Sequence, residues 1–113
     1  MDTTVTRREV LVGTGELALP GTLTLVPEAV GLIVFVHGSG SSRRSQRNLA
    51  VAEYLSEHGM STLLTDLLLS DEDAFDRHTG ELRFDIGFLS ERLGRIIDWC
   101  ALYPGCAGLP IGL

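Results

Sequence analysis

The segment Gly31–Ser42, GLIVFVHGSGSS, constrains the fold of this chain more than any other segment. Its part Leu32–His37 is almost uniformly apolar and mostly β-branched or aromatic, which is typical of a strand buried on both faces. Such strands belong to parallel sheets that helices cover on both sides. A glycine-rich turn follows the strand, and a helical pattern follows the turn, so this segment predicts an α/β arrangement.

Three other segments supply further strands. Arg8–Val26 alternates loosely and is interrupted by turn residues, including Gly13-Thr14-Gly15, so it predicts two or three short antiparallel strands. Met60–Asp66 predicts a second parallel strand, and Leu109–Leu113 predicts a third buried strand. The expected sheet therefore has antiparallel N-terminal strands leading into a mostly parallel part.

Two helices are predicted between the parallel strands. The first spans Ser45–His58, with Ser45 as the N-cap and Gly59 as the residue that ends it. The second carries an apolar stripe at three- and four-residue steps: Ile86, Leu89, Leu93, Ile96, Ile97 and Cys100. Glu91 and Arg95 stand four residues apart on its polar side. The acidic segment between strand and helix, 70–81, is expected to be irregular.

Composition narrows the class of function. The chain has 15 acidic residues against 9 basic ones and a formal net charge of −6, which argues against binding to nucleic acid or to an anionic membrane. No apolar run is long enough to span a bilayer, and the N-terminus has no apolar core of the signal-peptide kind, so we expect a cytoplasmic protein. Cys100 and Cys106 lack a metal-site spacing and are expected to be reduced thiols; no metal site is predicted.

The chain resembles the N-terminal half of an α/β-hydrolase of the dienelactone hydrolase-like branch. The resemblance rests on His37-Gly38-Ser39-Gly40 after the first core strand, on Leu109–Leu113 after the second helix, and on the stretch 77–100, which begins RHTGELRFDIGF. It implies that residues 1–113 form a single, incomplete domain with a truncated α/β-hydrolase fold. Residues 1–7 are expected to be disordered.

The resemblance also implies where the chemistry lies. In this family the nucleophile, the acid and the histidine follow one another along the chain, so all three would come after Leu113 and no catalytic side chain would be present here. What remains is the backbone N–H of Ser39 or Gly40 as an oxyanion donor, with His37 and Gly38 supporting the loop. One such donor contributes about 3 kcal/mol, so we expect this chain alone to be inactive.

The complete enzyme implied by the resemblance hydrolyses a small-molecule ester, lactone or related bond through a covalent intermediate, without a metal or organic cofactor. Arg43 and Arg44, with Arg47, form a small cationic cluster near a helix N-terminus that can receive an anionic group of the substrate. A solvated face is the simpler interpretation of this cluster. Asp66 ends a strand where it can either shape the pocket or orient a loop.

Two other classes of function remain open. Gly38-Ser39-Gly40 followed by Asp66 begins like a dinucleotide-binding motif, but Arg43 stands at its third glycine position and antiparallel strands do not precede a first Rossmann strand. A P-loop is excluded because the chain has no lysine. The other candidate is a non-catalytic remnant that associates with itself or with a complementary half through the strand edge near Leu109–Leu113.

Overall fold

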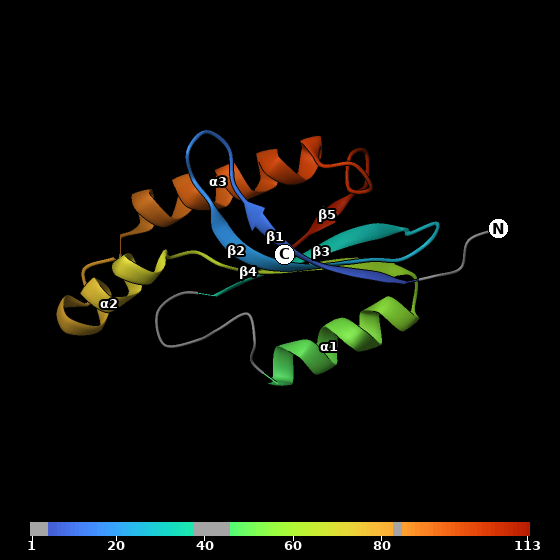
Figure 1. The fold of residues 1–113 in the computed structure, drawn as a ribbon, viewed down its shortest axis with the longest axis horizontal. Coiled ribbons are helices and arrows are strands. Elements are labelled where there is room, and N and C mark those ends of the chain that lie inside the picture. The colour runs from blue at the N-terminus through green and yellow to red at the C-terminus, as the bar shows by residue number, and fades with distance from the viewer. Residues whose placement is uncertain (1–4, 38–45, 83–84) are drawn as a thin grey trace.

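The computed structural model describes residues 5–37, 46–82 and 85–113 and shows a three-layer α/β fold. A five-stranded sheet in the order β1-β2-β4-β3-β5 forms the middle layer, with α1 on one face and α3 on the other (Figure 1). Among the described helices, none is long and apolar enough to cross a membrane. The elements are β1 (Thr6–Val12), β2 (Leu19–Leu25), β3 (Gly31–His37), α1 (Gln46–Glu57), β4 (Met60–Asp66), α2 (Ser70–Thr79), α3 (Ile86–Leu102) and β5 (Ile111–Gly112).

The N-terminal strands form an antiparallel hairpin, as predicted. β1 and β2 pair from Thr6 opposite Leu25 to Val12 opposite Leu19. Strand β1 therefore begins inside the segment 1–7 that the sequence suggested would be disordered. The turn between the strands needs Gly13, because its φ is +132° and a Cβ there would lie 2.8 Å from Cγ of Leu17.

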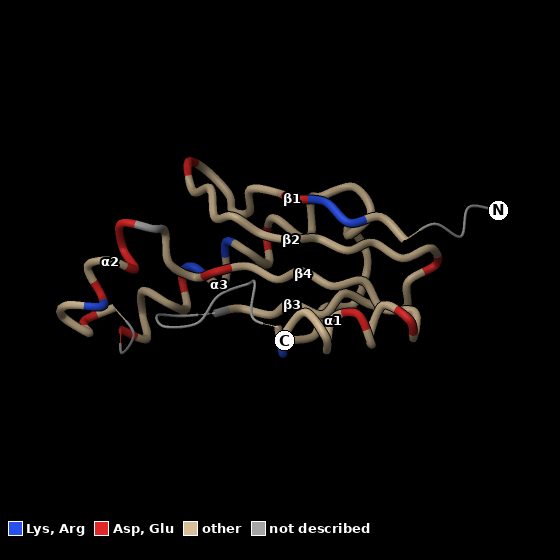
Figure 2. The backbone as a smooth tube through the Cα atoms, turned by 60° about the horizontal axis from the view of Figure 1, so that its bottom comes forward, with Lys and Arg blue, Asp and Glu red and all other residues tan. Residues whose placement is uncertain are grey.

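The parallel part of the sheet is built on β3. β3 and β4 run in register along their whole lengths, from Gly31 opposite Met60 to His37 opposite Asp66. β5 pairs with the other side of β3, and β2 pairs with β4 in the antiparallel sense. Figure 2 shows β1, β2, β4 and β3 side by side in this order. The strand predicted over Leu109–Leu113 is shorter than expected, since only two residues of it pair with β3.

The main core lies between the sheet and α3. Ile96 and Cys100 of α3 have no exposed surface and pack on alternate residues of the strands. The buried members of this cluster are Val12, Leu17, Leu19, Leu23, Leu32, Val34, Leu63, Ile96, Cys100 and Cys106. Two positions of α3 differ from the predicted stripe: Ile86 is 71% exposed, whereas Arg92 is buried. Helix α3 starts one residue after Asp85, whose carboxylate accepts a hydrogen bond from the N–H of Phe88.

Helix α1 covers the opposite face of the sheet and is less deeply buried. Ala52 is its one buried residue among those described, while Val51 and Tyr54 are exposed. His58 follows the helix, and its Nδ1 lies 2.8 Å from the carbonyl oxygen of Tyr54, which confirms the predicted position of this histidine at a helix C-terminus. Ser45, the predicted N-cap, lies outside the described residues.

The acidic segment 70–81, predicted to be irregular, instead contains the ten-residue helix α2. Its first turn carries three acidic residues, which favourably face the positive end of the helix dipole. Gly80 ends the helix in the left-handed conformation, with φ of +70°. Arg77 forms an ion pair with Asp73 one turn away, at 2.7 Å. The helix therefore owes its stability to its ends and charges rather than to an apolar stripe.

Candidate active-site edge

The carboxyl ends of β3 and β4 form the edge at which an α/β sheet of this kind binds its ligands. His37 and Asp66 are register partners at this edge, and the connection Leu67–Leu69 leads from Asp66 into α2. Helix α2 and the start of α3 lie at this end of the molecule (Figure 1). The two parallel strands predicted from the sequence thus end side by side at this edge.

The oxyanion loop itself stays a prediction. His37 ends β3, but Gly38, Ser39 and Gly40 lie outside the described residues, and so do Arg43 and Arg44. Arg47 is exposed in the first turn of α1. The described residues therefore test neither the proposed oxyanion donors nor the proposed anion contact.

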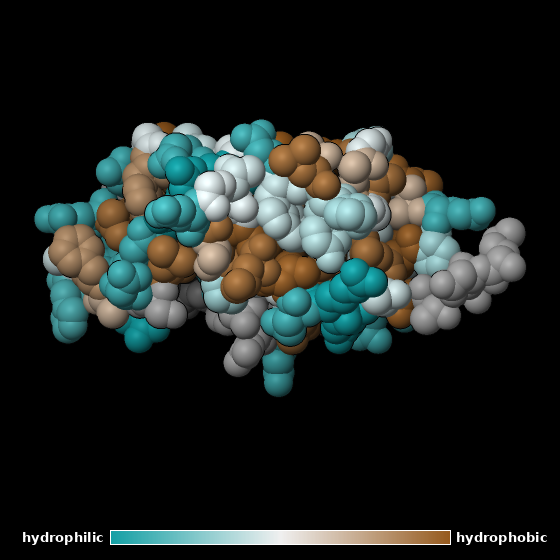
Figure 3. All heavy atoms as spheres, turned by 45° about the horizontal axis from the view of Figure 1, so that its top comes forward, coloured by the Kyte–Doolittle hydropathy of each residue, from teal (hydrophilic) through white to brown (hydrophobic). Residues whose placement is uncertain are grey.

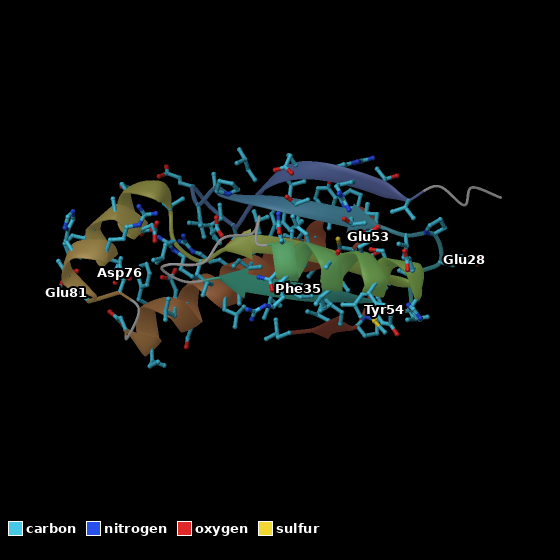
Figure 4. All side chains as sticks on the ribbon, turned by 90° about the horizontal axis from the view of Figure 1, so that it is seen from below. Glu28, Phe35, Glu53, Tyr54, Asp76 and Glu81 are labelled. Carbon is cyan, nitrogen blue, oxygen red and sulfur yellow. The ribbon has the colours of Figure 1, made fainter. Side chains whose placement is uncertain are left out.

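A groove of about 440 Å³ runs along β3 beside α1. It begins where β5 stops, since Gly112 pairs with Ile33 and the rest of β3 has no described partner on that side. Phe35 and Tyr54 both lie on the side of α1 that faces β5 (Figure 4). The lining residues are Ile33, Val34, Phe35, Val36, Asn48 and Leu113. This open groove extends along β3 toward the carboxyl edge of the sheet.

A partly buried ion pair fixes the connection between β4 and α2. The guanidinium of Arg92, on α3, donates to both carboxylate oxygens of Glu72, at 2.6 and 2.5 Å, and to the carbonyl oxygen of Leu67 at 3.0 Å. Glu72 in turn accepts a hydrogen bond from the N–H of Leu69 at 2.8 Å. The Arg92 guanidinium also lies over the ring of Phe88, 4.7 Å from its centroid. We call Arg92 and Glu72 the clamp.

The charge state of the clamp is set by these contacts. Burial by itself raises the pKa of Glu72, but the hydrogen bonds from Arg92 and from the N–H of Leu69 outweigh it. The net effect is a pKa below the ordinary value of 4.5, so Glu72 is ionised at neutral pH. The side chains of Arg92 and Glu72 are only 9% and 21% exposed, respectively, so water screens this pair less than a surface pair.

A buried carboxylate, that of Asp76, holds the far end of α2. Asp76 has no exposed surface, and its Oδ1 accepts a hydrogen bond from the N–H of Leu82 at 2.9 Å. The N–H of Gly80 donates to the backbone oxygen of Asp76 at 2.8 Å. The surface at the α2 end of the molecule carries both hydrophilic and apolar side chains (Figure 3). Of the two acids that anchor the helix, Asp76 is buried and Glu72 is partly buried. Helix α2 is thus fastened at both ends.

Sequence reasoning missed both anchors. The signal for Arg92 was present, because it stands three residues after Leu89 and four before Ile96, on the apolar stripe itself. A charged residue at such a position predicts a buried partner. No comparable signal marks Asp76, because the segment was not predicted to be a helix.

The cysteines and the acidic run offer no reactive or metal site in the described part of the chain. Cys100 and Cys106 are buried free thiols. Burial, with a smaller contribution from Cys106, raises the pKa of Cys100 to about 12, and burial also raises the pKa of Cys106. Neither is therefore a thiolate nucleophile at neutral pH. No three His, Cys, Asp or Glu side chains converge there as they would around a metal ion.

Comparisons with known proteins identify the fold. No family model matches the chain. A crystal structure of a dienelactone hydrolase from Anabaena variabilis is 44% identical, with a TM-score of 0.86 over 95% of this chain and 50% of that one. A dienelactone hydrolase-like promiscuous phosphotriesterase from metagenomic libraries shares the fold at 15% identity, with a TM-score of 0.69, covering 95% of this chain and 47% of that one.

Curated relatives match over a similar segment. Two proteins of Mycobacterium tuberculosis strains, each named "Putative phosphoribosyl transferase", are 44% identical over 104 residues. The match takes in 92% of this chain but 23% of each relative, so most of each relative lies outside it. The chain also spans about half the length of the similar solved structures, consistent with the N-terminal half predicted from the sequence. The order of strands, the helices on both faces and the similarity to the Anabaena enzyme together show an α/β-hydrolase-type fold that is similar to about half of a dienelactone hydrolase.

Proposed function

We propose that this chain is the N-terminal part of a hydrolase that cleaves ester or lactone bonds. The observation that carries the proposal is the 44% identity and TM-score of 0.86 with a dienelactone hydrolase over 95% of the chain. At that similarity the chain shares both a backbone and a large part of the residues that shape it. The reaction would run through a nucleophile, a histidine and an acid contributed by residues that follow Leu113 in the complete fold.

The difference in length between β3 and β5 at the carboxyl edge supports this placement of the nucleophile. Ile111 and Gly112 lie opposite Leu32 and Ile33, so continuation in the same register puts Leu113 opposite Val34. Phe35, Val36 and His37 then extend beyond that level. If β5 continued for a few more residues, it would fill the groove beside β3 and bring the following turn to the carboxyl edge, beside His37 and Asp66. A nucleophile on that turn would face the proposed oxyanion donors, Ser39 or Gly40.

The test compares the 113-residue chain with a protein in which the same chain continues into the second half of the fold. We expect the longer protein to hydrolyse p-nitrophenyl acetate or a simple lactone, and the 113-residue chain to be inactive. Replacing Ser39 by proline removes a backbone N–H and is expected to lower kcat by about 10²–10³ if this amide is the donor. The matched change Ser39→Ala keeps the N–H and is expected to keep kcat. Absence of hydrolysis by the longer protein, or turnover by the short chain, would contradict the proposal.

Phosphoribosyl transfer, the activity in the names of the curated relatives, is not the function proposed for this segment. The match covers under a quarter of each relative, and the segment folds like a hydrolase. Dinucleotide binding is also disfavoured, because the strand on the far side of β4 is the antiparallel β2, and β5 returns to the other side of β3. Titration with NAD distinguishes a hydrolase from a nucleotide-binding module, since saturable micromolar binding of NAD would favour the nucleotide-binding module.

Association through the free strand edge is a second candidate for the 113-residue chain on its own. Leu113 is 69% exposed and lines the groove next to β5. An unpaired edge with apolar side chains nearby is a template for pairing with another chain. Size-exclusion chromatography tests this, and a cooperatively melting monomer would count against it.

A further inference from the structure

A second pocket, of about 240 Å³, lies between α1 and the outer strands β1 and β2, and we call it the polar pocket. Its lining residues are Val5, Arg7, Thr24, Glu53, Ser56 and Glu57. Thr24 pairs with Thr62, the third residue of β4, whereas Asp66 at the candidate active-site edge is the seventh. Four residues of strand span about 13 Å, so the polar pocket lies toward the other end of the strands. It is separate from the proposed hydrolase site.

Two threonine hydroxyls at the floor of the polar pocket lack hydrogen-bond partners. Thr24 lines the pocket and is only 4% exposed, and its hydroxyl has no partner in the described part of the chain. Thr62, its register partner, has no exposed surface, and its Oγ1 is also unpartnered among the described residues. Buried hydroxyls of native proteins are nearly always hydrogen-bonded, to protein, water or a ligand. The hydroxyl of Thr24 is thus free to bond to an occupant of the pocket.

Two carboxylates on the wall of the polar pocket stand where a helix disfavours them. Glu57 is the last residue of α1 and Glu53 lies one turn earlier, while the last turn holds no basic residue. Negative charge destabilises this end of a helix, and like charges four residues apart repel each other. Glu53 lies on the side of α1 that faces β1 and β2, opposite Tyr54 (Figure 4). Neither carboxylate has a partner among the described residues, so a bound cation would relieve both unfavourable effects.

Arg7 brings a positive charge to the same pocket from β1. It lies opposite Thr24 in the β1–β2 register, and both residues line the pocket, so their side chains share the face toward α1. Arg7 is exposed, and its guanidinium forms no ion pair within the described ranges. A guanidinium binds a carboxylate through two parallel hydrogen bonds. The polar pocket therefore fits a ligand that carries charges of both signs.

We propose that the polar pocket binds a small zwitterion with a primary ammonium group and a carboxylate. The ammonium group lies between Glu53 and Glu57 and donates a hydrogen bond to the hydroxyl of Thr24, while the carboxylate pairs with Arg7. An ammonium group has three donors and no acceptor, which matches two carboxylates and a hydroxyl that is free to accept. The three charged side chains are exposed, so water screens them and the expected Kd is about 1 mM. This site does not depend on the proposed hydrolase function.

The experiment titrates the full-length protein with 4-aminobutanoate, butylammonium chloride and sodium butanoate, followed by the NMR signals of the Thr24 and Thr62 amides. We expect saturable shifts with 4-aminobutanoate, about tenfold weaker binding of butylammonium, and no saturation with butanoate. Glu57→Gln should weaken the binding of 4-aminobutanoate about tenfold, and Arg7→Met should abolish its advantage over butylammonium. Glu81→Gln is the matched control and should leave binding unchanged, because Glu81 is an exposed carboxylate at the far end of the molecule (Figure 4).

A pair of substitutions at Thr24 tests the hydroxyl itself. Thr24→Val keeps the shape of the side chain and removes a hydroxyl without a partner, so it should weaken binding about tenfold without lowering the melting temperature. Thr24→Ser keeps the hydroxyl and should keep the affinity within about threefold. Absence of saturable shifts would overturn the proposal, because the pocket would then hold water alone. Equal affinity for butylammonium and 4-aminobutanoate, or unchanged binding in Thr24→Val, would also contradict it.

Discussion

Two isoleucines of α3 look equivalent in the sequence and are predicted to differ sharply in their effect on stability. Ile96 and Ile86 both belong to the apolar stripe, but Ile96 has no exposed surface and Ile86 is 71% exposed. Ile96→Ala removes three buried carbons, worth about 2.4 kcal/mol at roughly 0.8 kcal/mol each. The cavity left in the core adds about 1 kcal/mol, and the better helix propensity of alanine returns about 0.4 kcal/mol. We expect a loss of about 3 kcal/mol in the free energy of unfolding.

Ile86→Ala is the control with the same chemistry. Its side chain is mostly in water at the first position of the helix, so we expect a change within about 0.5 kcal/mol. Urea unfolding of both variants, followed by far-UV circular dichroism and by the fluorescence of the single tryptophan, Trp99, measures the difference. The reasoning fails if the two variants lie within about 1 kcal/mol of each other at equal m-values, because burial of Ile96 would then not carry the packing of α3.

Three further predictions follow from other features. Gly13→Ala is expected to lower the free energy of unfolding by about 2 kcal/mol or more, because φ of Gly13 is positive and the new Cβ would clash with the buried side chain of Leu17. Gly94→Ala, with open space around it in α3, should raise the free energy of unfolding by up to about 1 kcal/mol. Thermal melts of the two variants show whether the two changes have opposite signs. Cys100 and Cys106 should resist alkylation at pH 8 in the native protein and react fully in urea; rapid labelling of either thiol without denaturant would contradict their burial. Glu72 has a lowered pKa in the folded state, so its contribution to stability is present above pH 4.5 and is lost as the pH falls through the lower folded value; Glu72→Gln should flatten the stability profile in that acid range.

The elements that depend on local apolar patterns were predictable from the sequence. β4 lies at Met60–Asp66 as predicted, and β3 is one residue longer than the predicted Leu32–His37. Buried strands of a parallel sheet have nearly continuous apolar runs, so a few adjacent residues are enough to predict their positions. The ion pair of Glu91 and Arg95 was also predictable, because it needs only the helix and a four-residue spacing.

Helix α2 and the clamp could not be predicted in the same way. The stabilising partner of Glu72 is Arg92, twenty residues further along the chain, and this contact exists only once α3 has packed on the sheet. Local charge patterns predicted a solvated loop because burial of the acids is decided by tertiary structure. The proposed oxyanion amides of Ser39 and Gly40 are predicted from motif position alone, since backbone N–H groups leave no side-chain signature.

The strand order has a consequence for the path of folding. β2 pairs with β4, so its ladder, from Gly21 opposite Thr65 to Thr24 opposite Thr62, closes a loop of about forty residues that includes all of β3. The β1–β2 hairpin can form locally as soon as it is synthesised, but it has no sheet to join until β4 has emerged. During translation one edge of the hairpin therefore stays unpaired until β4 leaves the ribosome, about forty residues later. Until then the hairpin depends for its stability on the turn that begins at Gly13, and its charged outer strand protects it from pairing with other chains.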